Sequence, residues 1–204
     1  MRARRKKWVT PFFESHPELR LENFQADDPF FQTSPLYLEI GFGKGDFLLG
    51  LSAIQAGHYL GIERDEQVVG IAYKKLMENG SESIRMFCGD VDFAFEKFQN
   101  LRFDKIYLNF SDPWPKLRHA KRRLTFAPRL ERIVSFLKEE GALVIKTDNE
   151  GLYEFTLEQA EAIHLKKTFD SKDYVFDEKS DAMSEYEKNF RSQGKNIFRL
   201  IYTR

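Results

Sequence analysis

Cysteine is almost missing from this chain of 204 residues, in which Cys88 stands alone. One cysteine excludes an intramolecular disulfide and a cysteine metal site, so we expect Cys88 to be a small core residue. The histidines show no ligand spacing either, and the sequence therefore predicts no metal. A chain without disulfides suits a reducing compartment, and we expect the cytoplasm.

Long hydrophobic runs are missing too. No apolar stretch approaches the length of a membrane span, and the segment after the basic start is too short and interrupted for the core of a signal peptide. The hydrophobic fraction is 42% and the charged fraction is 31%, values typical of a globular chain. Twenty phenylalanines supply much of the core that one domain of this length can bury.

Charge of one sign is not in excess, because the formal net charge is zero. The charges are nevertheless segregated along the chain. Residues 1–7 carry five basic residues and no acid, and residues 116–132 carry seven basic residues against one acid. Residues 150–190 hold eleven acids against five lysines. Concentrated basic segments on a neutral chain indicate local binding of phosphates.

Hydrophobic periodicity predicts an alternation of strands and helices from residue 36 onwards. The expected strands are 36–40, 59–62, 84–88, 103–110, 142–146 and 196–202, and the expected helices are 47–55, 67–79, 91–99, 127–139 and 151–163. This order is typical of an α/β protein with a mostly parallel sheet, in which the last strand pairs antiparallel near an edge. Residues 1–34 have no sustained period, and we expect an arm that packs on the domain or orders on a ligand.

The most informative segment is 109–116, NFSDPWPK, which follows a predicted strand and leads into the basic run 118–123. Ligands bind at the carboxyl ends of strands in open α/β sheets. Pro113 and Pro115 favour extended conformations for the residues before them, which should immobilise Asp112 and Trp114. A fixed carboxylate beside an indole suits a nucleobase held on a polyanion, although Trp114 could equally be buried.

A second candidate site follows the first predicted strand, where Glu39 precedes the turn Gly41-x-Gly43-x-Gly45. A dinucleotide fingerprint needs a glycine at position 46, which is Asp, so NAD and FAD are disfavoured. Glu63 lies at the end of the next strand and can accept from ribose hydroxyls. Glu39 would repel a pyrophosphate and attract a cation, which favours S-adenosylmethionine. Asp90 could accept from the adenine amino group or cap the helix at Val91.

These motifs together resemble the bacterial tRNA (guanine-N7)-methyltransferase family over essentially the whole chain. The string 109–116 with its basic run is specific, whereas most methyltransferases of this fold share the glycine turn. The tetrad 184–187 is part of the resemblance, and it opens with Ser184 where the family usually has threonine.

The resemblance implies a three-layer Rossmann-like methyltransferase fold for residues 35–204. It implies methyl transfer from S-adenosyl-L-methionine to N7 of a guanine in the variable loop of tRNA, with tRNA as partner and a homodimer as an open possibility. Expected cofactor contacts are Glu39, Gly41, Gly43, Gly45, Glu63, Asp90 and Asp112, and Asp112 is also the expected catalytic residue. Expected tRNA or guanine contacts are Lys116, Arg118, His119, Lys121, Arg122, Arg123, Asp148, Ser184 and Glu187.

Two of these residues have a structural alternative. Asp148 could instead cap the helix that starts near Gly151, and Ser184 with Glu187 fits a Ser-x-x-Glu capping box. Two other functions also remain open at this stage, namely methylation of an exocyclic base amine and RNA binding without turnover.

Overall fold

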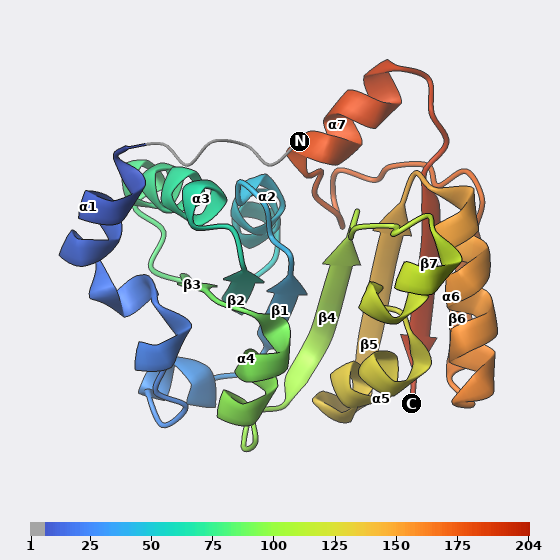
Figure 1. Cartoon of the computed structure of the whole chain (residues 1–204), viewed down its shortest axis with the longest axis horizontal. Coiled ribbons are helices and arrows are strands. Elements are labelled where there is room, and N and C mark those ends of the chain that lie inside the picture. Colours follow the sequence, from blue (N-terminus) through green and yellow to red (C-terminus); the bar gives the residue numbers. More distant parts are fainter. Residues whose placement is uncertain (1–6) are drawn as a thin grey trace.

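The computed structural model describes residues 7–204, which form a seven-stranded sheet with helices on both faces (Figure 1). The strands are β1 (Leu36–Ile40), β2 (His58–Glu63), β3 (Ile84–Cys88), β4 (Phe103–Asn109), β5 (Leu137–Thr147), β6 (Lys166–Ser171) and β7 (Phe198–Thr203). The α-helices are α1 (Val9–Ser15), α2 (Asp46–Ile54), α3 (Glu66–Asn79), α4 (Val91–Lys97), α5 (Ala127–Ser135), α6 (Glu150–Ala162) and α7 (Glu185–Ser192). Short 3-10 helices are η1 (Pro17–Leu19), η2 (Leu21–Asn23), η3 (Pro29–Gln32) and η4 (Leu117–Arg122).

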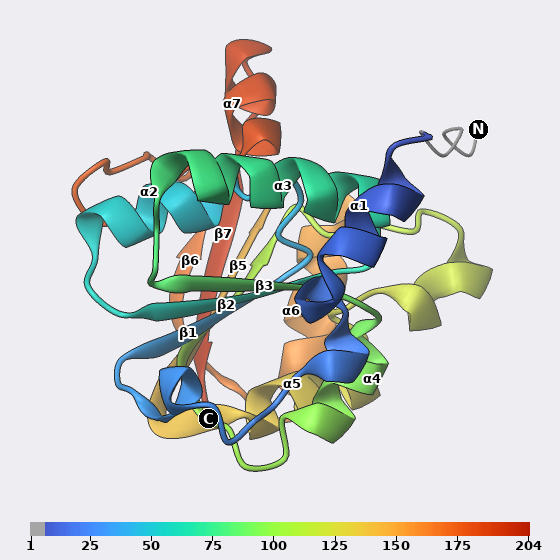
Figure 2. The ribbon, with the colours of Figure 1, turned by 90° about the vertical axis from the view of Figure 1, so that its left-hand side faces the viewer.

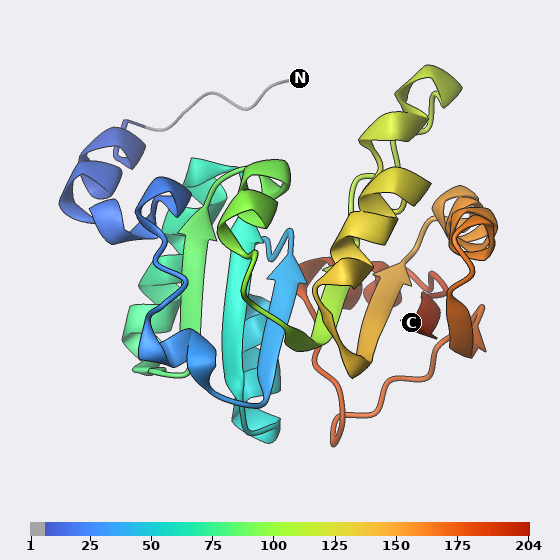
Figure 3. The same ribbon diagram turned by 90° about the horizontal axis from the view of Figure 1, so that it is seen from below.

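The sheet order is β3-β2-β1-β4-β5-β7-β6. Strands β1 to β5 are parallel, which confirms the predicted α/β class, and β7 runs antiparallel to both of its neighbours. Helices α1, α2 and α3 pack on one face of the sheet, and α4, α5 and α6 on the other (Figures 2 and 3). Because both faces are covered, all five residues of β1 are buried. None of the helices within residues 7–204 has the length and apolar character needed to cross a membrane.

Three features of the fold differ from the sequence-based expectation. The helix expected over 127–139 ends at Ser135, and the chain continues as the eleven-residue strand β5. Leu137 pairs with Phe103 of β4, and this long-range pairing overrides the local preference of the charged residues that follow. Strand β6 was not expected, because its residues are nearly all exposed and show no apolar alternation. Helix α7 was anticipated only through the capping-box alternative at Ser184.

Residues 7–34 wrap around the edge strand β3. Val9 and Phe13 of α1 belong to the core on one face, whereas Phe24 and Phe31 belong to the core on the other. Between them, Arg20 forms an isolated parallel bridge with Cys88 at the end of β3. The segment therefore shields part of an edge that would otherwise expose unpaired backbone groups. Residues 1–6, which carry much of the basic start, lie outside the described residues.

This packing predicts that Phe13→Ala destabilises the whole domain. The Phe13 side chain is 1% exposed, and replacing a buried phenylalanine by alanine costs about 3–5 kcal/mol. Urea unfolding should show that loss, while Glu14→Ala on the exposed side of the same helix should change stability by less than about 0.5 kcal/mol. Equal stabilities for the two variants would show that α1 is not part of the core.

Candidate functional site

A pocket of about 670 Å³ opens at the carboxyl ends of β1, β2, β3 and β4. The order of the sheet reverses between β1 and β4, and open α/β sheets bind ligands at such a point. Its lining includes Gly41, Gly43, Glu63, Arg64, Asp90, Asn109, Asp112, Trp114, Lys121, Arg122 and Tyr186. The structure thus brings together acidic, aromatic and basic residues from distant parts of the sequence.

The glycine turn forms one wall of this pocket. Gly41 and Gly43 adopt φ of 79° and 58°, in the left-handed region that side chains disfavour. The Gly41 amide donates to the carbonyl of Ile62 at 2.7 Å, which ties the turn to β2. Gly45, also expected at the cofactor, instead heads α2 and packs against Ala72 and Met86. Gly45 therefore lets helix and sheet approach closely and does not line the pocket.

Two acids at neighbouring strand ends point their acceptors into this region. Glu63 accepts hydrogen bonds from the backbone amides of Gly43 at 3.2 Å, Arg64 at 2.8 Å and Asp65 at 3.1 Å. These donors fix the carboxylate at the end of β2. Asp90 caps α4 by accepting from the amide of Asp92 at 2.8 Å, and it also lines the pocket. The cap alternative for Asp90 is therefore correct and does not remove it from the site.

Glu39 lies in the sheet beside the pocket and is 1% exposed. The Asn109 side-chain amide donates to its Oε1 at 2.8 Å, across the point where the sheet order reverses. Burial raises the Glu39 pKa to about 8, although the Asn109 hydrogen bond and the charge of Lys146 both lower it. Burial thus opposes the negative charge that the sequence led us to expect on this carboxyl.

Asp112 follows β4 on a strained turn. Phe110 and Trp114 adopt φ of 53° and 40°, which is uncommon for residues other than glycine. The extended conformation expected for Trp114 is thus wrong. The reason is Arg123, whose guanidinium donates to the carbonyls of Pro113 at 2.8 Å and Trp114 at 3.1 Å and so folds the turn back. Asp112 itself is 64% exposed and pairs with Arg64 at 3.0 Å.

The basic run forms the outer rim of the pocket. Most of it lies in η4, which projects from the body in yellow-green in Figure 3. Exposed side chains are Lys116, Arg118, Lys121 and Arg122, whereas His119 is half-buried beside Trp114. Arg122 stacks over the Trp114 ring at 4.9 Å. Arg123, in contrast, is 7% exposed, and its guanidinium is used by backbone carbonyls of the turn.

The remaining expected substrate residues lie beside the pocket but do not line it. Asp148 pairs with Lys195 at 2.8 Å, and Asn149, not Asp148, caps α6. Ser184 caps α7 by accepting from the Glu187 amide at 3.1 Å. Glu187 is fully buried in ion pairs. Roles for Asp148, Ser184 and Glu187 at a substrate therefore rest on the family resemblance.

Sequence reasoning did not single out Arg64, Arg129 or Asn109 as site residues, and it placed Tyr186 at the substrate only as a member of the tetrad 184–187. Arg64 directly follows Glu63 and holds Asp112, and Tyr186 lines the pocket from α7. Arg129 of α5 donates to Asp92 at 2.7 Å and to the Arg122 carbonyl at 3.1 Å, which anchors η4. Position after a strand could have indicated Arg64, but the partners of Arg129 follow only from the tertiary structure.

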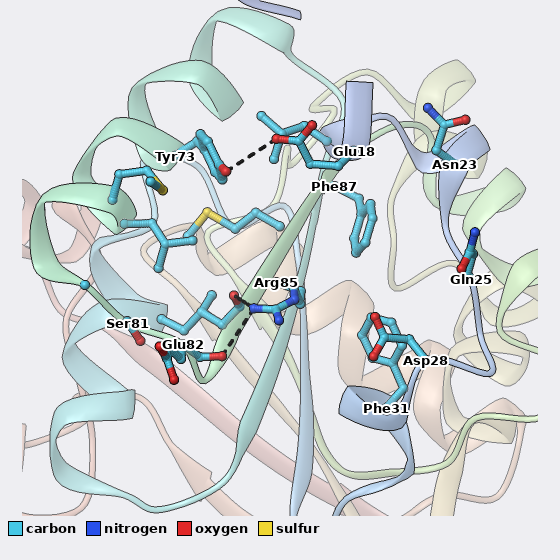
Figure 4. Close-up of a pocket in the computed structure, with 16 residues that line it drawn as sticks. Glu18, Asn23, Gln25, Asp28, Phe31, Tyr73, Ser81, Glu82, Arg85 and Phe87 are labelled. Atoms are coloured by element: carbon cyan, nitrogen blue, oxygen red, sulfur yellow. Dashed lines mark hydrogen bonds between the residues drawn. The ribbon is translucent and has the colours of Figure 1, made fainter. Parts of the chain in front are cut away.

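A second cavity, of about 630 Å³, runs along β3 beneath the N-terminal segment (Figure 4). Tyr73 donates to Glu18 at 3.4 Å on one side, and Arg85 donates to the carbonyls of Glu82 and Ile84 across from it. This cavity contains none of the residues expected at the cofactor or the substrate. The pocket at the strand ends is therefore the candidate active site.

Comparison with known proteins identifies the family. A family model described as "Putative methyltransferase" matches residues 33–200. The tRNA (guanine-N(7)-)-methyltransferase of Limosilactobacillus reuteri (strain DSM 20016) is 38% identical, covering 98% of this chain and 98% of its own. The chain belongs to the tRNA (guanine-N7)-methyltransferase family. The enzyme of that name from Staphylococcus aureus (strain Mu3 / ATCC 700698) is also 38% identical, covering 98% of this chain and 96% of its own.

The fold agrees with this membership. A solved structure, described as that of an antibiotic-related methyltransferase, superposes with a TM-score of 0.61 at 16% identity. The match covers 86% of this chain and 90% of the other. At that identity the likeness shows the fold, which is the three-layer Rossmann-like methyltransferase fold expected from the sequence.

The residues present fit S-adenosylmethionine, the methyl donor of tRNA (guanine-N7)-methyltransferases. Glu39 Oε2 and Asn109 Oδ1 are buried acceptors with no hydrogen-bond partner among residues 7–204. Buried acceptors are normally paired, so two adjacent unpaired ones beside the glycine turn suit a ligand that brings donors. A cation there would also favour the charged form of Glu39. Glu63 and Asp90 supply further acceptors at the next two strand ends.

The raised Glu39 pKa predicts a pH-dependent stability. The folded state binds a proton that the unfolded state releases near pH 4.5, so this contribution is complete below that pH and is lost as the pH rises through about 8. Between these two pH values the free energy of unfolding falls by up to about 1.4 kcal/mol per pH unit. Urea unfolding at several pH values should show that the free energy of unfolding of the parent falls relative to that of Glu39→Gln as the pH rises. Parallel curves for the two proteins would contradict the raised pKa.

Proposed function

We propose that this chain transfers a methyl group from S-adenosylmethionine to N7 of a guanine in the variable loop of tRNA. The observation that carries the proposal is a single pocket with two unlike walls. Behind one wall, in the sheet, Glu39 and Asn109 carry buried oxygens that have no partner among residues 7–204, which suits the methyl donor. The other wall carries Lys121 and Arg122 and suits a polyanion. Asp112 lines the same pocket.

The chemistry requires little from a general base. Guanine N7 has a free lone pair in the plane of the ring, and the bound cofactor supplies an electrophilic methyl group on its sulfonium. The protein must therefore align the two reactants and stabilise the positive charge that develops on the purine. Asp112 is suited to both tasks, because its carboxylate can accept from the guanine N1–H and amino group. We assign it as the catalytic residue.

Arg64 keeps Asp112 in place before the substrate arrives. Both side chains are more than 60% exposed, and exposed ion pairs contribute only about 0–1 kcal/mol. A guanine that offers two donors can therefore replace Arg64 at small cost. Arg64 would then be free to contact a phosphate, since it lines the same pocket.

The tRNA contacts follow from the exposed part of the basic run. Proteins recognise folded RNA largely through its shape and its backbone, and arginine binds phosphate through two parallel donors. Lys116, Arg118, His119, Lys121 and Arg122 are available for this purpose, whereas Arg123 shapes the turn. We place the protein in the cytoplasm, where it meets tRNA.

The function is tested by radiolabelled methyl transfer to unmodified tRNA, with the product nucleoside identified. We expect 7-methylguanosine, and we expect Asp112→Ala to lower activity by about 100-fold or more, the loss typical of a removed transition-state contact. Its melting temperature should hardly change, because the residue is exposed. Asp27→Ala, another exposed aspartate, serves as control. Activity within twofold of the parent would remove Asp112 from the mechanism, and a methylated exocyclic amine would replace the proposed reaction.

The basic residues at the rim of the pocket predict that tRNA binding depends on salt concentration. Lys121→Ala with Arg122→Ala should weaken tRNA binding and reduce the slope of log K against log salt by about 0.7–0.9 for each lost phosphate contact. The matched control is Arg102→Ala with Lys166→Ala, two exposed basic residues at the amino ends of β4 and β6. A salt titration in which both double variants keep the parental slope would assign η4 to a solvated surface.

A further inference from the structure

Helix α7 is attached to the body of the protein in an unusual way. A surface helix normally packs through an apolar stripe, but the one buried residue of α7 is Glu187. The helix stands beyond the carboxyl ends of the strands, apart from the layers that cover the sheet (Figures 1 and 2). The partners of Glu187 therefore contribute to holding the helix in place.

Glu187 binds Lys146 of β5, whose side chain is 1% exposed. The Lys146 ammonium donates to Glu187 at 2.7 Å, to Asp181 at 3.1 Å and to the Ala182 carbonyl at 2.9 Å. Arg191 completes the cluster by donating to the other oxygen of Glu187. Burying an ammonium is unfavourable unless its donors are satisfied, and here all the acceptors come from residues 181–187. Lys146 therefore holds the segment from Asp181 to Glu187.

The same lysine also fixes the turn that carries Asp112. Lys146 pairs in register with Asn109 of β4, and its carbonyl accepts from the Phe110 amide at 2.7 Å. The backbone of Lys146 thus holds the start of the 109–116 turn, while its side chain holds α7. Lys146 therefore connects α7 with the 109–116 turn, and both of these elements contribute lining residues to the pocket.

Helix α7 in turn places Tyr186 at the pocket. The Tyr186 ring lies against the glycine turn, where a β-carbon built on Gly43 would be 3.6 Å from Cε2. Tyr186 also stacks with Phe190, whose ring contacts Phe110 at 5.6 Å. On the outer side, Glu185 pairs with Lys44 of the turn at 2.8 Å. A displaced α7 would therefore remove an aromatic wall from the pocket.

We infer that Lys146 is a positioning residue, which holds α7 and Tyr186 over the pocket and so completes the site for methyl donor and purine. The inference rests on the proposed function for its effect on catalysis. Glu187 then acts through Lys146 and does not contact the substrate. If α7 occupies its place for only a fraction of the time, apparent affinity and rate fall by that fraction.

The test separates an effect on the position of α7 from an effect on the stability of the whole fold. Lys146→Met leaves Glu187 buried without its ammonium and should destabilise the fold. Lys146→Met with Glu187→Met replaces the pair by apolar side chains, which often restores stability, and Asp181 keeps Arg199 as a partner at 3.5 Å. Lys138→Met is the control, because Lys138 is also an ion-paired lysine of β5 but lies at the other end of that strand, paired with Asp104.

We expect the double variant to melt close to the parent while kcat/KM for tRNA stays lowered by about tenfold or more. Hydrogen exchange should show faster exchange of the α7 amides in the double variant and unchanged exchange in β1 and β4. Isothermal titration should show weaker binding of S-adenosylhomocysteine. Lys138→Met should match the parent in all three measurements.

Recovery of activity together with stability in the double variant would overturn the inference, as would a fully active Lys146→Met. If neither apolar variant folds, Glu187→Gln decides by the same measurements, because it keeps the shape and weakens the pair. The exchange and titration results do not depend on turnover. A parent that fails to methylate tRNA would therefore refute the proposed function while the position of α7 is still tested.

Discussion

The reversal of strand order between β1 and β4 is the constraint on which the site depends. Parallel strands bring their carboxyl ends to one edge, and the reversal sends the connecting segments of β1 and β4 apart, so a pocket opens there. The hydrogen bond from Asn109 to Glu39 bridges that point inside the sheet. It joins the glycine turn, which follows Glu39, to the turn that carries Asp112. The residues proposed to bind the cofactor and those proposed to bind the base are therefore attached to the same rigid part of the sheet.

Much of this frame could be predicted from the sequence, because it depends on local patterns. Five of the expected strands lie within two residues of their place, since buried parallel strands are short apolar runs bounded by turn residues. Strand β5 is the exception, because its first half carries charged residues that gain their pairing only from β4. Glu63, Asp90 and Asp112 lie at the pocket because each stands at or just beyond the carboxyl end of a strand, and that position is visible in the sequence.

The rest could not be predicted, because it depends on contacts between distant charged residues. Arg123 belongs to a basic run, yet its guanidinium is buried against backbone carbonyls of the 109–116 turn. Glu187 belongs to a polar helix, yet it is buried against Lys146, 41 residues away in sequence. Composition describes both as surface residues. Only the tertiary structure shows which partners satisfy a buried charge, and a run of charged residues in the sequence does not identify them.

A crystal structure of the chain with S-adenosylhomocysteine tests the central claim most directly. We predict the ligand between the glycine turn and Glu63, with a donor group within hydrogen-bond distance of Glu39 Oε2 or Asn109 Oδ1, two buried oxygens that have no partner in the described part of the chain. The Tyr186 ring of α7 should contact the bound ligand. A ligand bound in the cavity along β3, with both acceptors still unpaired, would contradict it.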